Sequence, residues 1–151
     1  MYFPLRHTCG RMVATADVGC YALTVRTQLT PGVRQLGTIQ AISVETGETR
    51  WTHDQPAFPM SLVATGGGLI FGGDANGRFK ALDQDTGEVL WEVNIGSPVT
   101  GFPVSYAVNG RQYVAVSTGR SLNTGALVRL PPELRPSTGN TQFVFALPVT
   151  R

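Results

Sequence analysis

The sequence has little charge and no run of one sign. Charged residues make up 15% of its 151 positions, and 12 lysines and arginines scattered among apolar stretches leave a formal net charge of +2. Recognition of nucleic acid requires basic residues gathered on one face or in one segment, so this pattern argues against such a partner. Long apolar runs are also missing. No stretch approaches the roughly 20 residues of a membrane-spanning helix, and we expect no transmembrane segment.

The chain also has few cysteines and no apolar leader. Its first twelve residues, MYFPLRHTCGRM, lack the apolar core of a signal peptide, so we expect no export signal on this chain. The two cysteines, Cys9 and Cys20, belong to no Cys-x-x-Cys unit, which argues against zinc and covalently bound haem. We expect two buried free thiols. The alternative is a disulfide between them, which would require an oxidising compartment.

Glycine and proline, in contrast, are abundant. The chain contains 18 glycines and 10 prolines, and 42% of its residues are hydrophobic. This composition is typical of many short strands joined by tight turns. A chain of this length forms one domain or a piece of a larger one. We therefore expect an all-β fold.

The segment GRFKALDQDTGEVLW, residues 77–91, predicts a β-hairpin. Gly77 follows an Asp-Ala-Asn cluster suited to a turn, and the strand RFKALD begins directly after it. Gly87 accepts the left-handed conformation that closes a short hairpin loop, and the strand EVLWEVN follows. The period of two places Trp91 on the same face as the two valines of this strand, so we interpret Trp91 as a packing residue.

Four aspartates stand in turns or at strand ends, namely Asp54, Asp74, Asp83 and Asp85. Carboxylates in such places commonly accept hydrogen bonds from neighbouring backbone N–H groups. Metal activation would require several of them to converge around one cofactor. We therefore interpret these aspartates as backbone caps, and none as catalytic.

A weaker copy of the hairpin, GTIQAISVETGETRW, occupies residues 37–51 at an offset of 40. The identities fall on the turn glycines and on the final tryptophan, where backbone geometry explains them. With further strands expected at residues 60–65 and 67–73, residues 60–94 form a four-stranded antiparallel meander. Its length and the repeat period are those of one blade of a β-propeller.

A third unit follows, with the strands GFPVSYAV and RQYVAVSTG joined by an Asn-Gly turn. An insertion at residues 120–140 separates them from the strand TQFVFALP. No tryptophan-bearing fourth strand follows, so we expect this unit to borrow an outer strand or to expose an edge. The chain thus divides into a blade with the first tryptophan motif, a complete blade and a last blade, at residues 1–58, 59–96 and 97–151.

The segment GGLIFGGDANGRFKALDQDTGEVLWEVNIGSPVTGFPVSYAVNGRQYVAV, residues 67–116, resembles the C-terminal blades of the quinoprotein alcohol dehydrogenases. This family comprises the methanol and ethanol dehydrogenases that depend on pyrroloquinoline quinone (PQQ). MYFPLRHTC and NTQFVFALP are similar to its blade openings and closing strand, and the tryptophan motif at residues 81–91 is the most specific part. The resemblance implies an eight-bladed propeller several times longer than this chain, of which about three four-stranded antiparallel blades are represented.

The resemblance also implies a cofactor, a metal and a reaction. In the family PQQ lies on the propeller axis, a bound calcium polarises its quinone, and an aspartate acts as base while hydride leaves the alcohol. The calcium ligands and the base belong to blades upstream of the matching segment, so we expect no catalytic or metal-binding residue here. The implied partners are an alcohol-type substrate and the remaining blades or a partner chain. The implied location is periplasmic.

Four positions are candidates for contact with PQQ. His7 stands where many relatives carry an asparagine that contacts the quinone ring system. Phe58 stands near the place of a tryptophan on which PQQ stacks in methanol-oxidising relatives. Gly119 and Arg120 begin the segment where many relatives read Gly-Trp-Gly-Gly, and an arginine suits an acidic cofactor. The alternative for Arg120 is a solvated loop residue.

Two functions remain open at this point. We expect the C-terminal part of a PQQ-dependent dehydrogenase that oxidises an alcohol-type substrate and is inactive alone. The alternative is a non-enzymatic propeller scaffold, such as a periplasmic assembly factor or a WD-repeat-like interaction module. Plain PQQ repeats occur in such scaffolds, so blade geometry alone does not choose between the two.

Overall fold

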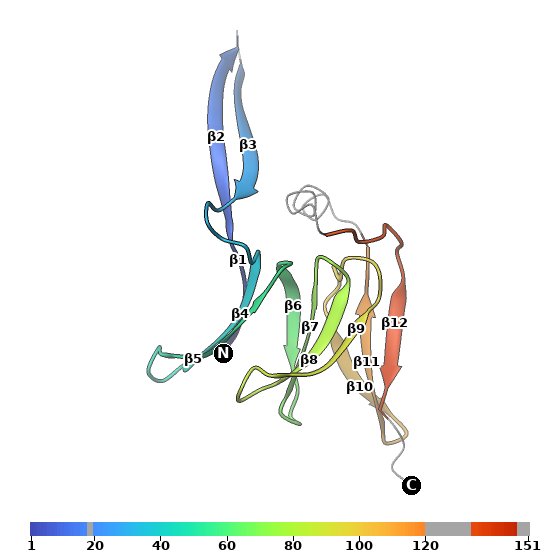
Figure 1. Cartoon of the computed structure of the whole chain (residues 1–151). Helices are drawn as coiled ribbons and strands as arrows, with labels where there is room; N and C mark the ends of the chain where they lie inside the picture. The colour runs from blue at the N-terminus through green and yellow to red at the C-terminus, as the bar shows by residue number, and fades with distance from the viewer. Residues whose placement is uncertain (18–19, 120–133, 148–151) are drawn as a thin grey trace.

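The computed structural model describes residues 1–17, 20–119 and 134–147, and within these ranges it contains strands and turns but no helix. Twelve strands form four antiparallel sheets in the described residues (Figure 1). The all-β expectation is confirmed.

One sheet holds four strands in sequence order. They are β6, β7, β8 and β9, which span Pro59–Ala64, Leu69–Asp74, Arg78–Asp83 and Val89–Asn94. These bounds agree closely with the predicted meander. The two turn glycines also behave as predicted, because Gly77 and Gly87 have φ angles of 81° and 75°.

A three-stranded sheet precedes the four-stranded one. In it β4 (Gly37–Ile42) and β5 (Thr49–Gln55) repeat the β8–β9 hairpin. The strand β1 (Tyr2–Arg6) pairs with β4 in the place that β7 takes beside β8. This sheet therefore has the second, third and outer strands of a blade among the described residues.

A second three-stranded sheet follows the four-stranded one. Its strands β10 (Val104–Val108), β11 (Arg111–Ser117) and β12 (Gln142–Ala146) lie in sequence order and correspond to β6, β7 and β8. In the described part of the chain no strand pairs with the outer edge of β12, so this edge is exposed, as one of the two predicted outcomes requires.

A long two-stranded ribbon extends away from the blades (Figure 1). It consists of β2 (Thr8–Asp17) and β3 (Cys20–Leu29), and nothing in the repeat pattern predicted it. The register pairs Cys9 with Gln28 and Cys20 with Asp17. Eight residues of strand, roughly 26 Å, therefore separate the two cysteines along the ribbon.

This separation excludes a disulfide between the two cysteines, while the side chain of Cys20 lies outside what the structure describes. A disulfide needs Cα atoms within about 7 Å of each other, so the disulfide alternative is wrong. Cys9 is a free thiol, as predicted, but it is only half-buried, because it lies at the base of the ribbon.

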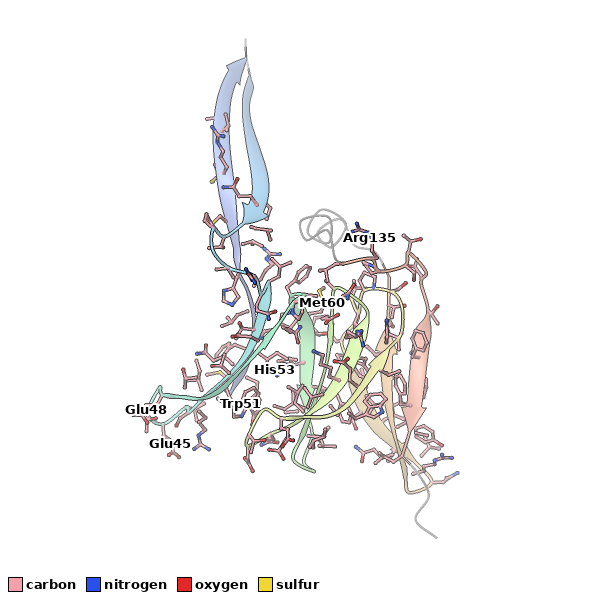
Figure 2. The ribbon with its side chains drawn as sticks, in the orientation of Figure 1. Glu45, Glu48, Trp51, His53, Met60 and Arg135 are labelled. Atoms are coloured by element: carbon pink, nitrogen blue, oxygen red, sulfur yellow. The ribbon has the colours of Figure 1, made fainter. Side chains whose placement is uncertain are left out.

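Two segments that a simple meander lacks, the β2–β3 ribbon and the predicted insertion, lie at one end of the sheets. The ribbon leaves the blades at this end, and Arg135, within the predicted insertion, lies there with Met60 (Figure 2). Glu45 and Glu48 mark the opposite end, at the turn between β4 and β5. Both additions follow the second strand of their blade. We call the end with Met60 and Arg135 the insertion end.

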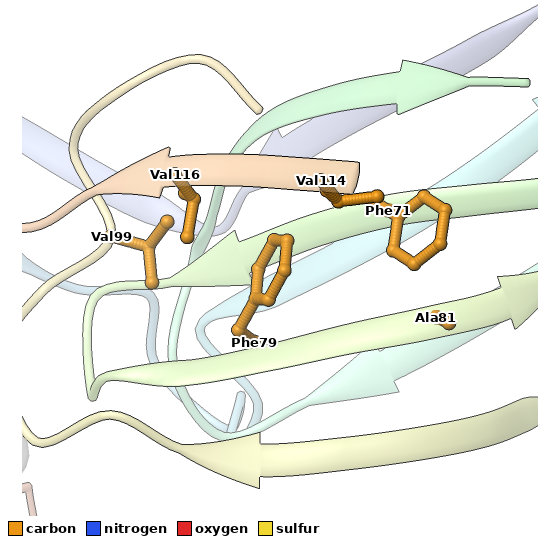
Figure 3. Packing of buried hydrophobic residues seen from close by; sticks show 6 residues of the cluster. All are labelled: Phe71, Phe79, Ala81, Val99, Val114 and Val116. Atoms are coloured by element: carbon orange, nitrogen blue, oxygen red, sulfur yellow. The ribbon is translucent and has the colours of Figure 1, made fainter. Parts of the chain in front are cut away.

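Apolar side chains fill the two joints between neighbouring sheets. The first joint, between the β1–β4–β5 sheet and the four-stranded sheet, is centred on Ile39, Ile70 and Leu82. The second joint, between the four-stranded sheet and the last one, has more buried residues than the first. Figure 3 shows them, namely Phe71, Phe79, Ala81, Val99, Val114 and Val116. Burial of one large side chain of this kind contributes roughly 1.5–3 kcal/mol, so these clusters hold the sheets together.

The tryptophan of the first motif crosses the first joint. The indole N–H of Trp51 donates to the backbone oxygen of Gln84, in the next blade, at 3.0 Å. A Cβ added at Gly87 would lie 2.5 Å from Cε3 of Trp51, so only glycine permits this approach. The motif therefore joins consecutive blades.

Trp91 occupies the same place in the second copy of the motif. Its ring packs edge-on against Phe79 and Phe145, with centroid separations of 6.1 and 5.2 Å. The packing role predicted for Trp91 is confirmed.

Candidate functional site

A groove of about 490 Å³ opens between β1 and β6. Tyr2, Pro4 and Arg6 line one side, because alternate residues of β1 point to the same face. The first residues of β6, among them Met60, line the other side, and Phe102 contributes from the link to β10. The groove therefore reaches the insertion end, where Met60 lies (Figure 2).

Arg6 and Phe58 meet in this groove. The guanidinium carbon of Arg6 lies 5.9 Å from the centre of the Phe58 ring, within the range of a cation–π contact. Phe58 is only 4% exposed and packs with Leu36, Ala75 and Leu134, so its ring is held in place. Among the described lining residues Arg6 alone carries a formal charge, which makes the groove cationic.

Phe58 is one of the predicted contacts, whereas Arg6 is not. The available signal was the alternation of β1, which puts Arg6 on the same face as Tyr2. What no local pattern supplies is the packing of β1 beside β6, which creates the groove.

His7 lies on the other face of the same sheet. His7 Nε2 lies 2.7 Å from Thr38 Oγ1, and the Thr38 hydroxyl donates to Asp54 Oδ1 at 2.6 Å. Thr38 is 5% exposed. The interpretation of Asp54 as a backbone cap is therefore wrong, because its carboxylate accepts from a side chain on the neighbouring strand.

Gly119 follows β11 and lies near Thr100, which lines the groove. Its N–H donates to the backbone oxygen of Pro98 at 2.9 Å. A Cβ added at Gly119 would lie 2.5 Å from Asn140 Oδ1 and 3.8 Å from Oγ1 of Thr100, a groove residue. Arg120 lies outside the described residues. The structure thus places Phe58 in the groove, Gly119 beside its wall and His7 on the opposite face of β1.

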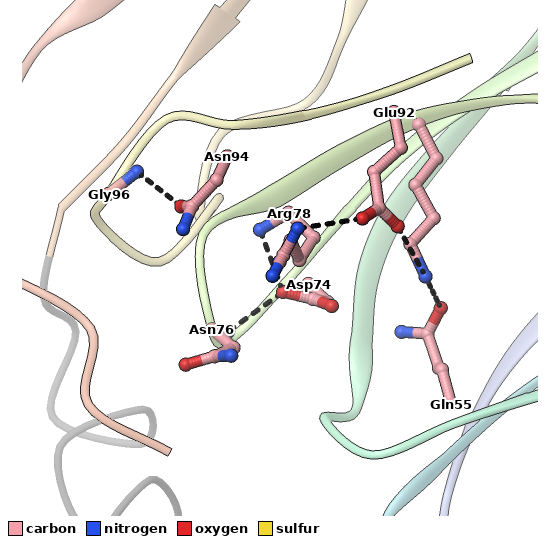
Figure 4. Close-up of polar contacts among 8 residues, drawn as sticks. Gln55, Asp74, Asn76, Arg78, Glu92, Asn94 and Gly96 are labelled. Atoms are coloured by element: carbon pink, nitrogen blue, oxygen red, sulfur yellow. Dashed lines mark hydrogen bonds and ion pairs between the residues drawn. The ribbon is translucent and has the colours of Figure 1, made fainter.

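Two other aspartates do cap turns. Asp83 Oδ1 accepts the backbone N–H groups of Asp85 and Thr86, at 2.9 and 2.8 Å, and these contacts, with that to Thr86 first, lower the pKa of Asp83. Asp74 Oδ1 accepts the backbone N–H groups of Asn76 and Arg78 (Figure 4). Burial nevertheless raises the pKa of Asp74. The cap interpretation is confirmed for Asp74 and Asp83, while Asp85 takes part through its backbone N–H.

A charged cluster lies in the first joint (Figure 4). Glu92 accepts from Arg78 at 2.9 Å and lies 3.4 Å from Lys80, whose ammonium donates to Gln55 at 3.2 Å. Lys80 is 7% exposed, so this cation is taken out of water and held by its partners. His53 Nε2 is buried without a hydrogen-bond partner in the described part of the chain. Burial, and then the charge of Lys80, lower the pKa of His53.

The described residues do not form a metal centre. Across residues 1–17, 20–119 and 134–147 no three His, Cys, Asp or Glu side chains lie close enough together to hold a metal ion. These residues therefore do not fit calcium. In the same ranges no helix is long and apolar enough to cross a membrane.

Known proteins resemble the chain in both sequence and fold. The family profile described as PQQ, "Glucose/ethanol/alcohol dehydrogenase, beta-propeller domain", matches residues 34–114. The chain is 40% identical over 85 residues to methanol dehydrogenase (cytochrome c) subunit 1 of Methylorubrum extorquens, a match covering 56% of this chain and 14% of that protein. It is 35% identical over 86 residues to quinoprotein ethanol dehydrogenase of Pseudomonas putida, with the same two shares.

A solved structure, a europium-containing methanol dehydrogenase, superposes with a TM-score of 0.79 at 28% identity. The superposition covers 97% of this chain and 30% of that one. The resemblance read from the sequence is confirmed, and so is the partial propeller. The chain spans 14% of the length of the two curated relatives.

Proposed function

The chain belongs to the family of PQQ-dependent glucose, ethanol and alcohol dehydrogenase β-propellers, and from this premise we propose that it is a C-terminal segment of such a propeller. Its enzyme would oxidise an alcohol-type substrate, as the names of its relatives indicate. The ring would be completed by further blades or by a partner chain, and the assembled enzyme would work in the periplasm. The proposed blade limits are residues 1–58, 59–96 and 97–151.

The observation that carries this proposal is the cationic groove. PQQ is a planar aromatic quinone that bears carboxylates, so a site for it needs apolar walls and a cation. Phe58 and Met60 offer the walls and Arg6 offers the cation. The similarity to methanol and ethanol dehydrogenases favours the enzyme over the non-enzymatic alternative.

The residues described here would hold the cofactor rather than perform chemistry. When bound, PQQ would accept the hydride that leaves the alcohol carbon, and this hydride carries both electrons of the oxidation. Arg6 would fix a carboxylate of PQQ, and buried Phe58 would keep water from that edge of the ring. We retain Phe58, Gly119 and Arg120 as proposed contacts of PQQ at this groove. His7 lies on the opposite face of β1, so its proposed contact rests on the family resemblance alone. We assign no step to calcium, because the described residues do not fit it.

Titration of the purified chain with PQQ, followed by quenching of tryptophan fluorescence, tests the proposal. We expect weak, saturable binding that Arg6→Gln reduces about tenfold, because a charge-assisted hydrogen bond is lost. Arg50→Gln, at an exposed arginine of β5, is the matched control and should bind like the wild type. In a dye-linked alcohol oxidation assay this chain alone should show no turnover.

Three outcomes would contradict the proposal. Absence of PQQ binding by the wild type would favour the scaffold. Equal binding by Arg6→Gln and the wild type would remove the groove from the site. Clear turnover by these 151 residues alone would overturn the assignment of the catalytic residues to other blades.

A further inference from the structure

We infer that the distal face of the last sheet is the docking face for a further blade, which packs on it through apolar side chains. The distal face is the side of β10, β11 and β12 that carries Tyr106 and Val144 and points away from the second joint. Figure 1 shows this sheet at the end of the row of sheets. The inference rests on the proposed function, since it names the face at which the ring would continue.

Apolar side chains are exposed on the distal face. Alternate residues of β10 point to the same side, and Val104, Tyr106 and Val108 are 54%, 40% and 49% exposed. Val144 of β12 is 52% exposed. A hollow of about 360 Å³ opens on this face, and Phe102, Val104 and Tyr106 are among the residues that line it. Contiguous apolar surface of this kind marks an interaction site.

The four-stranded sheet shows how an equivalent face is covered. Directly paired residues of antiparallel strands share a face, and Val63, Phe71 and Ala81 form such a row across β6, β7 and β8. This row belongs to the second joint, where it meets the last sheet. Phe71 and Ala81 are therefore only 8% and 5% exposed, and Phe79, which lies on the same face, is fully buried.

The last sheet repeats this row on its distal face. Tyr106, Tyr113 and Ala146 are paired in the same order across β10, β11 and β12. Val144 precedes Ala146 by two residues and so takes the place of Phe79 on the four-stranded sheet. The two faces hold equivalent positions, but only the face of the four-stranded sheet is covered in the described residues. A sheet that covers the distal face would form a third joint of the same kind as the second.

The free face of the first sheet does not suit the distal face. It carries His7 and Asp54, whereas the rows through Tyr106 and Val144 bear no charge and Arg111 lies beyond them beside the turn. Packing of the Asp54 carboxylate on valine and tyrosine would take a charge out of water without a partner. Head-to-tail stacking of copies of this chain is therefore unfavourable, and the expected occupant is a different blade with an apolar face.

A chimera that supplies further blades tests the inference. In it this chain replaces the segment of the europium-containing methanol dehydrogenase on which it superposes. Val104→Lys and Val144→Lys should each lower the yield of soluble, folded chimera several-fold, because a neighbouring blade would bury the new ammonium group. Val44→Lys is the matched control, since Val44 is 74% exposed in the turn between β4 and β5, and it should give the parent yield.

The full chain on its own provides the comparison. Its distal face is exposed, so Val104→Lys and Val144→Lys should unfold at the same denaturant concentration as the wild type. Analytical ultracentrifugation of dilute samples should show monomers for the wild type and for both variants. A loss that occurs in the chimera but not in the isolated chain is due to a covering blade and not to the strands themselves.

Four outcomes would overturn the inference. The first two are equal yields of the parent chimera and both lysine variants, and a parent chimera that does not fold, because the face would then not accept a blade of this family. The third is an equal loss of stability in the isolated chain. The fourth is a dimer of the isolated chain that Val104→Lys dissociates, which would make a second copy the occupant.

All of these measurements are made without PQQ, which separates the inference from the proposed function. If the chain does not bind PQQ while the chimera depends on the distal face, the proposed cofactor site is wrong and the docking face stands. If PQQ binds as expected while the chimera tolerates both lysines, the cofactor site stands and the docking face is wrong.

Discussion

Trp51 and Trp91 end two copies of one motif, yet they have different surroundings. Trp51 donates a hydrogen bond to the backbone oxygen of Gln84 in the next blade. Its ring also stacks with that of Tyr2, with 5.8 Å between the centroids. Trp91 remains 40% exposed, although it packs against two phenylalanines. The motif supplies a tryptophan, and the following blade must supply the turn that covers it. For Trp91 the turn that would follow β12 lies outside the described residues.

The two joints also differ in their chemistry. The first joint combines aliphatic residues with the buried Lys80, its partner Glu92 and Nε2 of His53, which has no hydrogen-bond partner among the described residues. The second joint is filled by apolar side chains, with Phe79 at its centre. Protonation of His53 can therefore change the stability of the first joint, whereas the second joint is filled chiefly by apolar side chains.

Gly87→Ala should have the largest effect on the first joint. The new methyl group would lie 2.5 Å from Trp51 and the residue has a φ of 75°, so we expect a loss of roughly 2–5 kcal/mol of unfolding free energy. Gly47→Ala is the matched control, because Gly47 has the same place in the first motif and a φ of 74° with open space around it. It should lose only about 1–2 kcal/mol. Denaturant unfolding measures both, and equal losses would mean that the indole can move aside.

Replacement of the two tryptophans by phenylalanine tests the comparison directly. Trp51→Phe removes the hydrogen bond to Gln84 and leaves its carbonyl group without that donor, so we expect a loss of about 1–2 kcal/mol. Trp91→Phe keeps an aromatic edge against Phe79 and should lose less than about 1 kcal/mol. Denaturant unfolding measures both losses, and a larger loss for Trp91→Phe than for Trp51→Phe would reverse the expected ranking of the two tryptophans.

The pH dependence of the first joint should give the smallest effect. Burial and Lys80 lower the pKa of His53 below its ordinary 6.5, so the unfolded chain binds the proton more tightly than the folded one. The contribution of His53 is therefore complete above pH 6.5 and is lost as the pH falls through that value toward the lowered folded pKa. Unfolding between about pH 5 and 8 measures this slope. His53→Gln should flatten it, and an unchanged slope would assign the dependence to another group.

The local features of the blades could be predicted from the sequence, because each depends on residues close together in the chain. Gly77 and Gly87 mark turns by their conformational freedom, and Asp83 caps a turn made by the three residues after it. The repeat offset of 40 residues also predicts the β4–β5 hairpin, and the structure contains it.

What the sequence did not predict depends on register and on neighbouring sheets. Asp54 has its partner on another strand, and only the pairing of β4 with β5 shows that this partner is Thr38. The role of Arg6 depends on its contact with Phe58, which follows four further strands along the chain. No repeated sequence segment predicts the β2–β3 ribbon.

The free edge of β12, the outermost strand of the last sheet, affects how this protein behaves in solution. The segment Gln142–Ala146 bears no charged side chain, and one side of its backbone is free of partners among the described residues. An uncharged edge strand with unpaired backbone N–H and C=O groups can pair with a strand of another chain. Concentrated solutions should therefore tend toward self-association, and a cognate neighbour that caps this strand would act as a solubiliser.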